Sequence, residues 1–190
     1  PRLALEKIPL FVFTAASCVI TVFVQSKSGA VQSVESLPLL QRLQNVFVSY
    51  IEYLAKFFVP VDLIPHYAMT PRPLPLVVFC VFLLAAISVK ALLSARTRPY
   101  LFTGWFWYLG MLVPVIGIVQ VGDQAMADRY TYTPTIGVAI AAVWLVREWV
   151  LPKPGIVRGV VAASCALLVF LTIATVRQTM YWKDGVTLFA

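Results

Sequence analysis

Charged side chains are scarce in this chain: aspartate, glutamate, lysine and arginine make up 12% of its 190 residues. The motifs of soluble enzymes are missing as well, since there is no glycine-rich phosphate loop, no serine-nucleophile motif and no His-Glu-x-x-His zinc motif. There is one histidine, and each of the three cysteines lies in an apolar run without a Cys or His at metal-ligand spacing. The catalytic classes that such motifs mark are excluded, and these residues predict no metal site.

Apolar residues, in contrast, are abundant. Hydrophobic side chains account for 61% of the chain and the mean hydropathy is +0.87, well outside the range of a soluble domain. This composition predicts an all-α integral membrane protein, because an isolated span has to satisfy its own backbone hydrogen bonds. Five stretches approach the roughly 20 residues that a helix needs to cross the hydrocarbon core. We expect transmembrane helices at residues 8–25, 74–94, 100–121, 132–151 and 157–176, with Pro114 kinking the third.

Residues 39–58 differ from these five spans, because their apolar residues recur at helical spacing and leave a polar face. The polar face carries Gln41, Asn45, Ser49, Glu52 and Lys56. The pattern predicts an amphipathic helix that lies flat in the outer membrane interface, with the loops before and after it on the same side. The alternative is a sixth helix packed inside the bundle, with its polar face toward other helices.

Basic residues gather at two connections between spans. The first is flanked by Lys90, Arg96 and Arg98, and the second by Arg147, Lys153 and Arg158. Short cytoplasmic loops are enriched in Lys and Arg, so both connections are predicted to be cytoplasmic. The N-terminus is then cytoplasmic, whereas residues 122–132 and the tail from Arg177 lie outside. This topology explains the net charge of +7, and no basic stripe apart from the span ends indicates a nucleic-acid partner.

One concentrated polar stretch, residues 122–132, lies between two strongly apolar segments and carries two carboxylates, a guanidinium and two phenols. Charges beside a bilayer are costly unless they face water, a partner or a ligand. A guanidinium forks onto phosphate oxygens, and phenols add further donors. The stretch therefore predicts a phosphate site at the membrane surface. With the single histidine, the candidate substrate-binding residues are Arg129, Asp128, Tyr130, Tyr132, Asp123 and His66.

A purely structural interpretation of the same residues is also open. Asp128 or Asp123 would pair with Arg129, and the tyrosines would belong to the aromatic belt of the interface. His66 has Asp62 four residues before it, which suits an acid–base or metal role, but a lone loop histidine is also simply an exposed one. Four aromatic residues near the inner end of the third span are predicted to be interfacial anchors: Tyr100, Trp105, Trp107 and Tyr108.

Three segments carry a resemblance to a known family. They are Gly104-Trp-Phe-Trp-Tyr-Leu-Gly-Met-Leu-Val-Pro-Val-Ile-Gly-Ile-Val-Gln120, Ala127-Asp-Arg-Tyr-Thr-Tyr-Thr-Pro134 and Tyr181-Trp-Lys-Asp-x-x-Thr-Leu-Phe189. Through them the chain resembles bacterial multi-pass proteins bearing tetratricopeptide repeats, relatives of the transmembrane O-mannosyltransferases of the C-type glycosyltransferase superfamily. The resemblance covers nearly the whole chain, including the amphipathic segment that ends in a proline and an Asp-Leu pair, and is strongest over residues 100–134.

The resemblance implies transfer of a sugar from a polyprenyl-phosphate donor to a protein hydroxyl at the extracytoplasmic face, with inversion and a carboxylate base. Residues 1–176 would be the distal half of the membrane domain, a partial bundle of the C-type glycosyltransferase kind. Residues 177–190 would begin an extracytoplasmic repeat region. The base of such enzymes lies in the first outer loop, which would precede Pro1. The catalytic residue is therefore unknown, and the segment is not expected to be active alone.

By residue-wise comparison, Asp128, Arg129, Tyr130 and Tyr132 match the outer-loop signature of the family. The resemblance assigns Arg129 to the donor phosphate and Asp128 to orienting it, with Asp62 or Asp123 as a remote alternative for the base. A divalent metal ion is left open as a cofactor, and no other cofactor is indicated.

Two other functions are compatible with the sequence. The chain would be a non-catalytic membrane anchor for periplasmic repeats that act in envelope or polysaccharide assembly, or a flippase for a lipid-linked sugar. A flippase would need charges or broken helices near mid-membrane, and only Pro114 with its neighbouring glycines fits. The expected location is the bacterial inner membrane, multi-pass, with a cytoplasmic N-terminus and a periplasmic C-terminus. The expected partners are the lipid bilayer, a polyprenyl-phosphate sugar, and a protein acceptor or a protein bound by the repeats.

Overall fold

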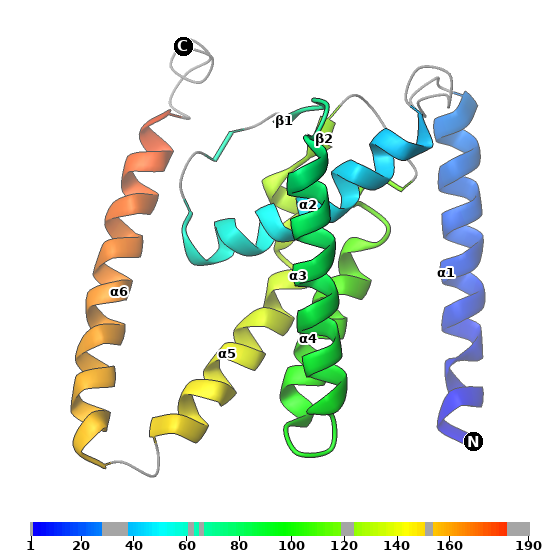
Figure 1. Cartoon of the computed structure of the whole chain (residues 1–190). Helices are drawn as coiled ribbons and strands as arrows, with labels where there is room; N and C mark the ends of the chain where they lie inside the picture. The colour runs from blue at the N-terminus through cyan, green and yellow to red at the C-terminus, as the bar shows by residue number, and fades with distance from the viewer. Residues whose placement is uncertain are drawn as a thin grey trace.

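The computed structural model describes residues 2–27, 38–60, 63–64, 67–118, 124–150 and 154–181. This part of the chain is mainly helical, with a short two-stranded sheet at one end (Figure 1). In chain order its elements are α1 (Arg2–Lys27), α2 (Leu39–Phe58), β1 (Tyr67–Ala68), α3 (Leu74–Leu93), α4 (Pro99–Leu112), β2 (Gln124–Met126), the 3-10 helix η1 (Asp128–Thr131), α5 (Pro134–Val150) and α6 (Pro154–Tyr181).

Prolines begin most of these helices. α4, α5 and α6 start at Pro99, Pro134 and Pro154, and Pro75 is the second residue of α3. Proline has a fixed φ and no N–H group, and the N–H groups of a first helical turn have no intrahelical partner. The prolines therefore determine the residue at which each of these helices begins.

Two helices in the described residues are long and apolar enough to cross a membrane, namely α3 and residues Gly155–Met180 of α6. The predicted helical class is confirmed, and the length and composition of these two helices agree with a membrane location. The helix α1 includes the whole of the predicted span 8–25, whereas α4 and α5 overlap the predicted spans 100–121 and 132–151 only in part, and the crossing of a membrane by these three helices stays a prediction.

The third predicted span ends earlier than expected. α4 stops at Leu112, so its 14 residues extend about 21 Å, less than the roughly 30 Å of the hydrocarbon core. Pro114 has no N–H to continue the helical hydrogen bonds. Gly117 then adopts a φ of 97°, a conformation that favours glycine. Together they end the helix, where a kink within a continuing helix was predicted.

The helix α2 has the predicted boundaries and runs obliquely across α3 (Figure 1). Its apolar side packs Tyr50 into the same core as Leu84 of α3. Its polar side is not in water, because Arg42, Asn45 and Ser49 expose at most 6% of their surface. The burial of these three side chains favours the alternative in which the polar face packs against other parts of the chain, whereas a position in the outer interface stays a prediction.

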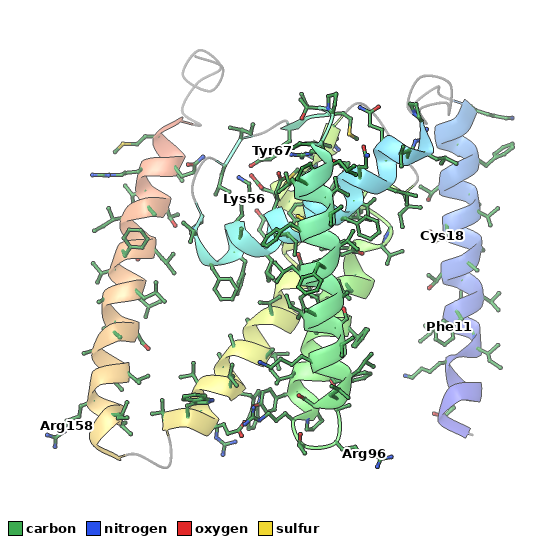
Figure 2. The ribbon with its side chains drawn as sticks, viewed as in Figure 1. Phe11, Cys18, Lys56, Tyr67, Arg96 and Arg158 are labelled. Atoms are coloured by element: carbon green, nitrogen blue, oxygen red, sulfur yellow. The ribbon has the colours of Figure 1, made fainter. Side chains whose placement is uncertain are left out.

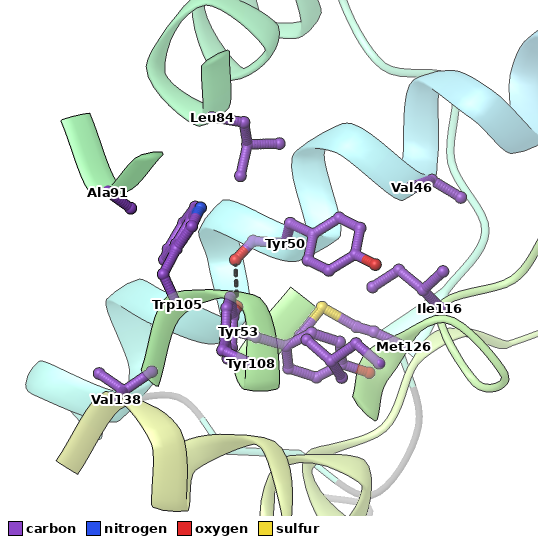
Figure 3. Packing of buried hydrophobic residues seen from close by; sticks show 11 residues of the cluster. Val46, Tyr50, Tyr53, Leu84, Ala91, Trp105, Tyr108, Ile116, Met126 and Val138 are labelled. Carbon is purple, nitrogen blue, oxygen red and sulfur yellow. Dashed lines mark hydrogen bonds between the residues drawn. The ribbon is translucent and has the colours of Figure 1, made fainter. Parts of the chain in front are cut away.

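The core where α2, α3 and α4 meet is aromatic (Figure 3). Tyr108 is fully buried, packs edge-on against Tyr50 with ring centroids 6.1 Å apart, and donates its hydroxyl to the Tyr50 carbonyl at 2.5 Å. Trp105 is buried and donates its indole N–H to Ser88 Oγ at 2.9 Å. The prediction that Trp105 and Tyr108 are interfacial anchors is therefore wrong. Trp105 and Tyr108 are three residues apart in a helix, so both side chains face the core. Trp107 faces outward and is 44% exposed.

The most extensive helix–helix contact in the described residues joins α4 and α5. Their backbones approach closely at Gly104 and Gly137. A Cβ atom on Gly104 would lie 2.3 Å from the Gly137 carbonyl oxygen, and a Cβ on Gly137 would lie 2.4 Å from the Gly104 oxygen. Small residues at a crossing are what let membrane helices pack by van der Waals contact.

Replacing Gly104 or Gly137 by alanine is expected to destabilise the protein, because the new methyl group would have to displace backbone. Overpacking of this kind costs about 1–3 kcal/mol, which a thermal unfolding experiment on the purified protein in detergent would detect. Gly110→Ala is the matched control in α4, since a Cβ there meets nothing within 4 Å. The control should keep or slightly raise stability through better helix propensity. Equal losses at positions 104 and 110 would contradict the close crossing.

Candidate functional site

Residues 124–132 of the polar stretch lie at the end of the molecule where β1 pairs with β2, here called the sheet end. The two strands are antiparallel, with Tyr67 opposite Met126. η1 follows β2 directly and leads into α5. Figure 2 shows Lys56 and Tyr67 toward this end, and Arg96 and Arg158 at the opposite end. Arg96 and Arg158, one from each basic connection, thus lie at the same end of the molecule, away from the candidate site.

Asp128 takes part in a hydrogen-bond chain at the sheet end. Its Oδ2 accepts a hydrogen bond from the Tyr67 hydroxyl at 2.8 Å, and that hydroxyl accepts from the Ile64 N–H at 3.1 Å. The ammonium of Lys56 lies 4.8 Å from the centre of the Tyr67 ring. Burial raises the pKa of Asp128 above its ordinary value, opposed by the Tyr67 hydrogen bond and the Lys56 charge. The Asp128 carboxyl therefore holds a proton more readily than an exposed aspartate.

Arg129 is exposed and points to different partners. Its Nη2 is 3.5 Å from Gln124 Oε1, and its guanidinium lies 5.1 Å from the centre of the Tyr130 ring. Gln124 in turn donates its amide to the Tyr130 hydroxyl at 3.0 Å. In the part of the chain that the structure describes, Arg129 makes no ion pair with Asp128, although the two are neighbours in sequence. The structure thus separates the two residues that were expected to act on one phosphate.

A cleft of about 250 Å³ opens between the C-terminal half of α2 and the start of α5. Its lining residues are Tyr53, Lys56, Phe57, Pro60, Leu63, Asp128, Thr131, Tyr132 and Thr135. The cleft brings Asp128 and Tyr132 of the predicted site together with Lys56. Arg129 and Tyr130 do not line it. The cation of this cleft is therefore a lysine of the amphipathic helix.

One wall of the cleft is fixed by Tyr53, which is fully buried. Its hydroxyl accepts from the Ala127 N–H at 2.9 Å and is 3.2 Å from the Ala127 carbonyl, to which it donates. Burial raises the pKa of Tyr53 to about 12, so the phenol stays neutral and keeps both bonds. The opposite wall is fixed by Thr131 and Thr135, whose hydroxyls donate to the carbonyls of Asp128 and Thr131 at 2.7 Å each.

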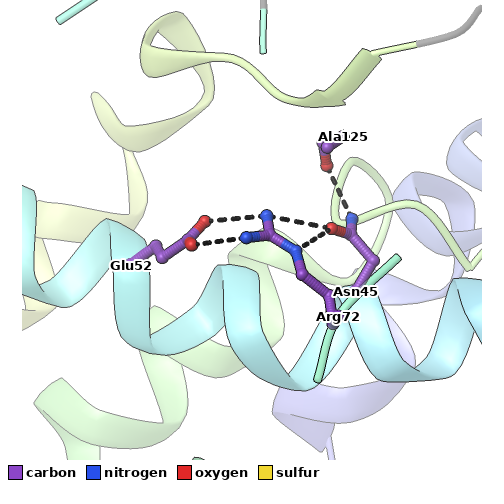
Figure 4. A network of polar contacts seen from close by, with 4 residues as sticks. All are labelled: Asn45, Glu52, Arg72 and Ala125. Atoms are coloured by element: carbon purple, nitrogen blue, oxygen red, sulfur yellow. Dashed lines mark hydrogen bonds and ion pairs between the residues drawn. The ribbon is translucent and has the colours of Figure 1, made fainter. Parts of the chain in front are cut away.

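Arg72 joins the segment before α3 to the polar face of α2 (Figure 4). Its guanidinium forks onto the Glu52 carboxylate, at 2.8 and 3.1 Å, and also reaches Asn45 Oδ1 at 3.3 and 3.4 Å. The Asn45 amide then donates to the carbonyl of Ala125 in β2 at 2.9 Å. The Arg72 guanidinium thus links the start of α3 to α2, and Asn45 links α2 to β2. Because η1 follows β2 directly, these contacts also position η1 beside Lys56.

The predicted site residues differ in whether they line the cleft. Asp128 lines the cleft, Tyr132 is 78% exposed at its edge, and Arg129 and Tyr130 lie outside it. Asp123, His66 and Asp62 lie outside the described residues. Sequence reasoning missed the cleft role of Lys56, Tyr53, Thr131 and Thr135, and the contact of Tyr67 with Asp128. Two signals pointed to part of this set: the polar face of residues 39–58 included Lys56, and the polar stretch 122–132 included Thr131.

Comparison with protein-family models, with curated proteins and with solved structures found no match to this chain. Within the described ranges, no three His, Cys, Asp or Glu side chains gather in a way that would hold a metal ion. The chemistry on which a function can be built is therefore that of the cleft: one ammonium, one carboxyl of raised pKa, and several hydroxyls.

Asp128→Asn is expected to stabilise the protein more at neutral pH than in acid. The carboxyl has its ordinary pKa, 3.8, when unfolded and a raised pKa when folded, so the folded state binds more protons between the two and stability falls as pH rises through this interval. Asparagine keeps an oxygen for the Tyr67 hydroxyl and carries no charge. The difference in unfolding temperature between variant and wild type should therefore be larger at pH 7 than at about pH 3.5. The opposite order would show that burial does not disfavour this carboxylate.

Arg72→Lys is expected to destabilise the protein although it keeps the charge. An ammonium does not fork onto Glu52 while also reaching Asn45, and hydrogen bonds to charged groups contribute about 1.5–3 kcal/mol each. Partial exposure of Glu52, 34%, places the expected loss toward the lower value. The control is Arg98→Lys, because Arg98 pairs with Glu148 at the exposed opposite end and should matter less. Thermal unfolding of both variants tests this, and equal losses would contradict it.

Proposed function

We propose that this chain is part of a membrane glycosyltransferase that moves a sugar from a polyprenyl-phosphate donor to a protein hydroxyl at the extracytoplasmic face. One observation supports the proposal beyond the sequence resemblance. The cleft at the sheet end combines the Lys56 cation of α2 with the threonine wall and with Asp128, which belongs to the polar stretch that carries the resemblance. Its volume of about 250 Å³ is small for a ligand pocket. It suits a phosphate headgroup whose lipid chain stays outside.

The proposed orientation rests on where the basic residues lie. Arg96 and Arg158 lie at the end opposite the cleft (Figure 2). Cytoplasmic loops are enriched in such residues, so the cleft would open to the extracytoplasmic side, where polyprenyl-phosphate donors are used in this family. The same orientation gives five crossings, in which α1, α4 and α5 join the two longer apolar helices.

In this proposal Lys56 takes the role that the sequence had given to Arg129. A lysine ammonium is a compact charge that binds phosphate as a point contact. An ionised Asp128 beside a phosphate would repel it, whereas a carboxyl of raised pKa is more easily neutral and adds a donor. Arg129, exposed on the other side of η1, would face the acceptor. We assign no catalytic base among the described residues.

The decisive experiment is binding of a polyprenyl-phosphate sugar to the purified full-length parent protein, measured by native mass spectrometry. Lys56→Gln should weaken binding by about 10- to 100-fold, the value of one charge-assisted hydrogen bond. Arg129→Gln is the matched control and should bind like wild type. Unfolding temperatures of both variants would confirm that each still folds.

Two other results of this binding experiment would contradict the proposal. Loss of binding in Arg129→Gln with retention in Lys56→Gln would move the donor to the opposite side of η1. Absence of binding to the wild-type protein would remove the transferase proposal and favour a membrane anchor for periplasmic repeats.

A further inference from the structure

A surface rich in cations lies at the end of the molecule opposite the cleft and is here called the basic end. It is formed where α3 and α5 end and where α4 and α6 begin, and Figure 2 shows Arg96 and Arg158 there. Its described basic side chains are Lys90, Arg96, Arg98, Arg147 and Arg158. Among the described residues of these four helix ends there is one carboxylate, Glu148. Five cations against one anion leave an excess of four positive charges, to which the proposed transfer reaction assigns no role.

The carboxylate of the basic end is already occupied. Glu148 Oε1 accepts from Arg98 Nε at 3.1 Å and lies 2.9 Å from Arg98 Nη2, while Oε2 accepts from the Tyr100 hydroxyl. Arg147 precedes Glu148 directly, and adjacent residues of a helix do not face each other. The basic side chains that make no ion pair within the described part of the chain are Lys90, Arg96, Arg147 and Arg158. These four cations are therefore left for a partner outside the chain.

Arg147 is held by an aromatic ring instead of a carboxylate. Its guanidinium lies 4.6 Å from the centre of the Trp144 ring, and that ring stacks on Tyr100 with centroids 6.4 Å apart. A cation–π contact uses the charge of a guanidinium but not its N–H donors. Arg147 is exposed, so its donors remain available to fork onto two phosphate oxygens. A side chain that is already positioned loses less conformational freedom when it binds.

The apolar side chains beside these cations indicate that the phosphate belongs to a lipid. Trp144 and Trp149 of α5 are 45% and 65% exposed, and Leu93 at the end of α3 is 80% exposed. Tryptophan is enriched at the level of membrane headgroups, and α3 is long and apolar enough to cross a membrane. A nucleic acid would place its charged backbone against these apolar side chains. A phospholipid instead brings a phosphate for the cations and acyl chains for the apolar surface.

We propose that the basic end binds the headgroups of anionic phospholipids, with Arg96 and Arg147 as the main contacts. The Arg98–Glu148 pair joins the turn before α4 to the end of α5, which places Arg96 and Arg147 on adjoining elements. A zwitterionic headgroup offsets its own phosphate, whereas phosphatidylglycerol keeps a net negative charge that the excess cations attract. The proposal depends on α3 crossing the membrane. It is independent of sugar transfer, because no residue of the basic end lines the cleft.

The test compares two double variants that remove the same charge from opposite ends. Arg96→Gln with Arg147→Gln acts at the basic end, and Arg129→Gln with Arg177→Gln is the matched control, since both of these are exposed on η1 and the far end of α6. Proteins in neutral detergent are titrated with dioleoylphosphatidylglycerol and dioleoylphosphatidylcholine, and bound lipid is measured by native mass spectrometry. Each basic residue near a membrane surface contributes a factor of about five in affinity, so the basic-end variant should bind phosphatidylglycerol roughly 25-fold more weakly. Phosphatidylcholine binding should be unchanged, and the control should bind both lipids like wild type.

Two results of this titration would overturn the proposal. Equal weakening in both double variants would show a general attraction between charges instead of a site at the basic end. Retention of phosphatidylglycerol by the basic-end variant, with loss in a Lys56→Gln protein, would place the lipid phosphate in the cleft. Unfolding temperatures would establish that each variant folds, as substitutions of exposed side chains should allow.

A second measurement needs no variant and decides the question if the basic-end variant does not fold. Wild-type protein in vesicles of dioleoylphosphatidylcholine receives phosphatidylglycerol with a diazirine in its headgroup. Crosslinks should concentrate on residues 93–98 and 144–150. Crosslinks that are equally frequent at the sheet end would overturn the proposal. So would displacement of the basic-end crosslinks by a short DNA duplex, which would make a nucleic acid the partner.

Discussion

The guanidinium of Arg72 makes the contacts on which the sheet end depends. It binds Glu52 and Asn45 on one face of α2, and Asn45 extends the contact to Ala125. Near a bilayer, polar side chains without internal partners are costly, and α2 carries several of them. Because loops of the same chain supply the partners, an amphipathic helix is able to lie across other helices with its polar side covered. Ser49 Oγ is an exception among the described residues, because it is buried without a hydrogen-bond partner, which costs free energy.

The same contacts decide what the polar stretch after α4 offers to a ligand. β2 is fixed by Asn45, and Ala127 is fixed by Tyr53, so η1 begins at a defined point above α2. From that point Asp128 is directed toward Tyr67, while the next side chain, Arg129, is directed away from it. Adjacent residues in sequence therefore serve different surfaces. The proposed donor site consequently belongs to two elements far apart in sequence, α2 and η1.

The sequence predicted the elements better than their contacts. Local signals, such as apolar runs and amphipathic spacing, gave α2 its correct limits and located α3 and α6, because both depend on nearby residues. The end of α4 was missed, since Pro114 was expected to bend the helix and Gly117 was not recognised as a turn residue. The roles of Trp105 and Tyr108 were missed because an aromatic residue near the end of a span gives the same sequence signal whether it faces lipid or packs against a crossing helix. Lys56 and Asp128 are more than 70 residues apart, a separation that no local pattern reports.

The contact between Gly104 and Gly137 has a mechanical consequence. Backbone against backbone leaves no flexible side chain to absorb displacement, so α4 and α5 should move as one rigid body. Thr135 lies on that body, whereas Lys56 lies on α2. The width of the cleft is then a single coordinate, the rotation of the α4–α5 pair against α2. Rotation of that pair against α2 would break the hydrogen bonds that join Tyr50 to Tyr108 and Leu109, so these contacts hold the cleft at its observed width.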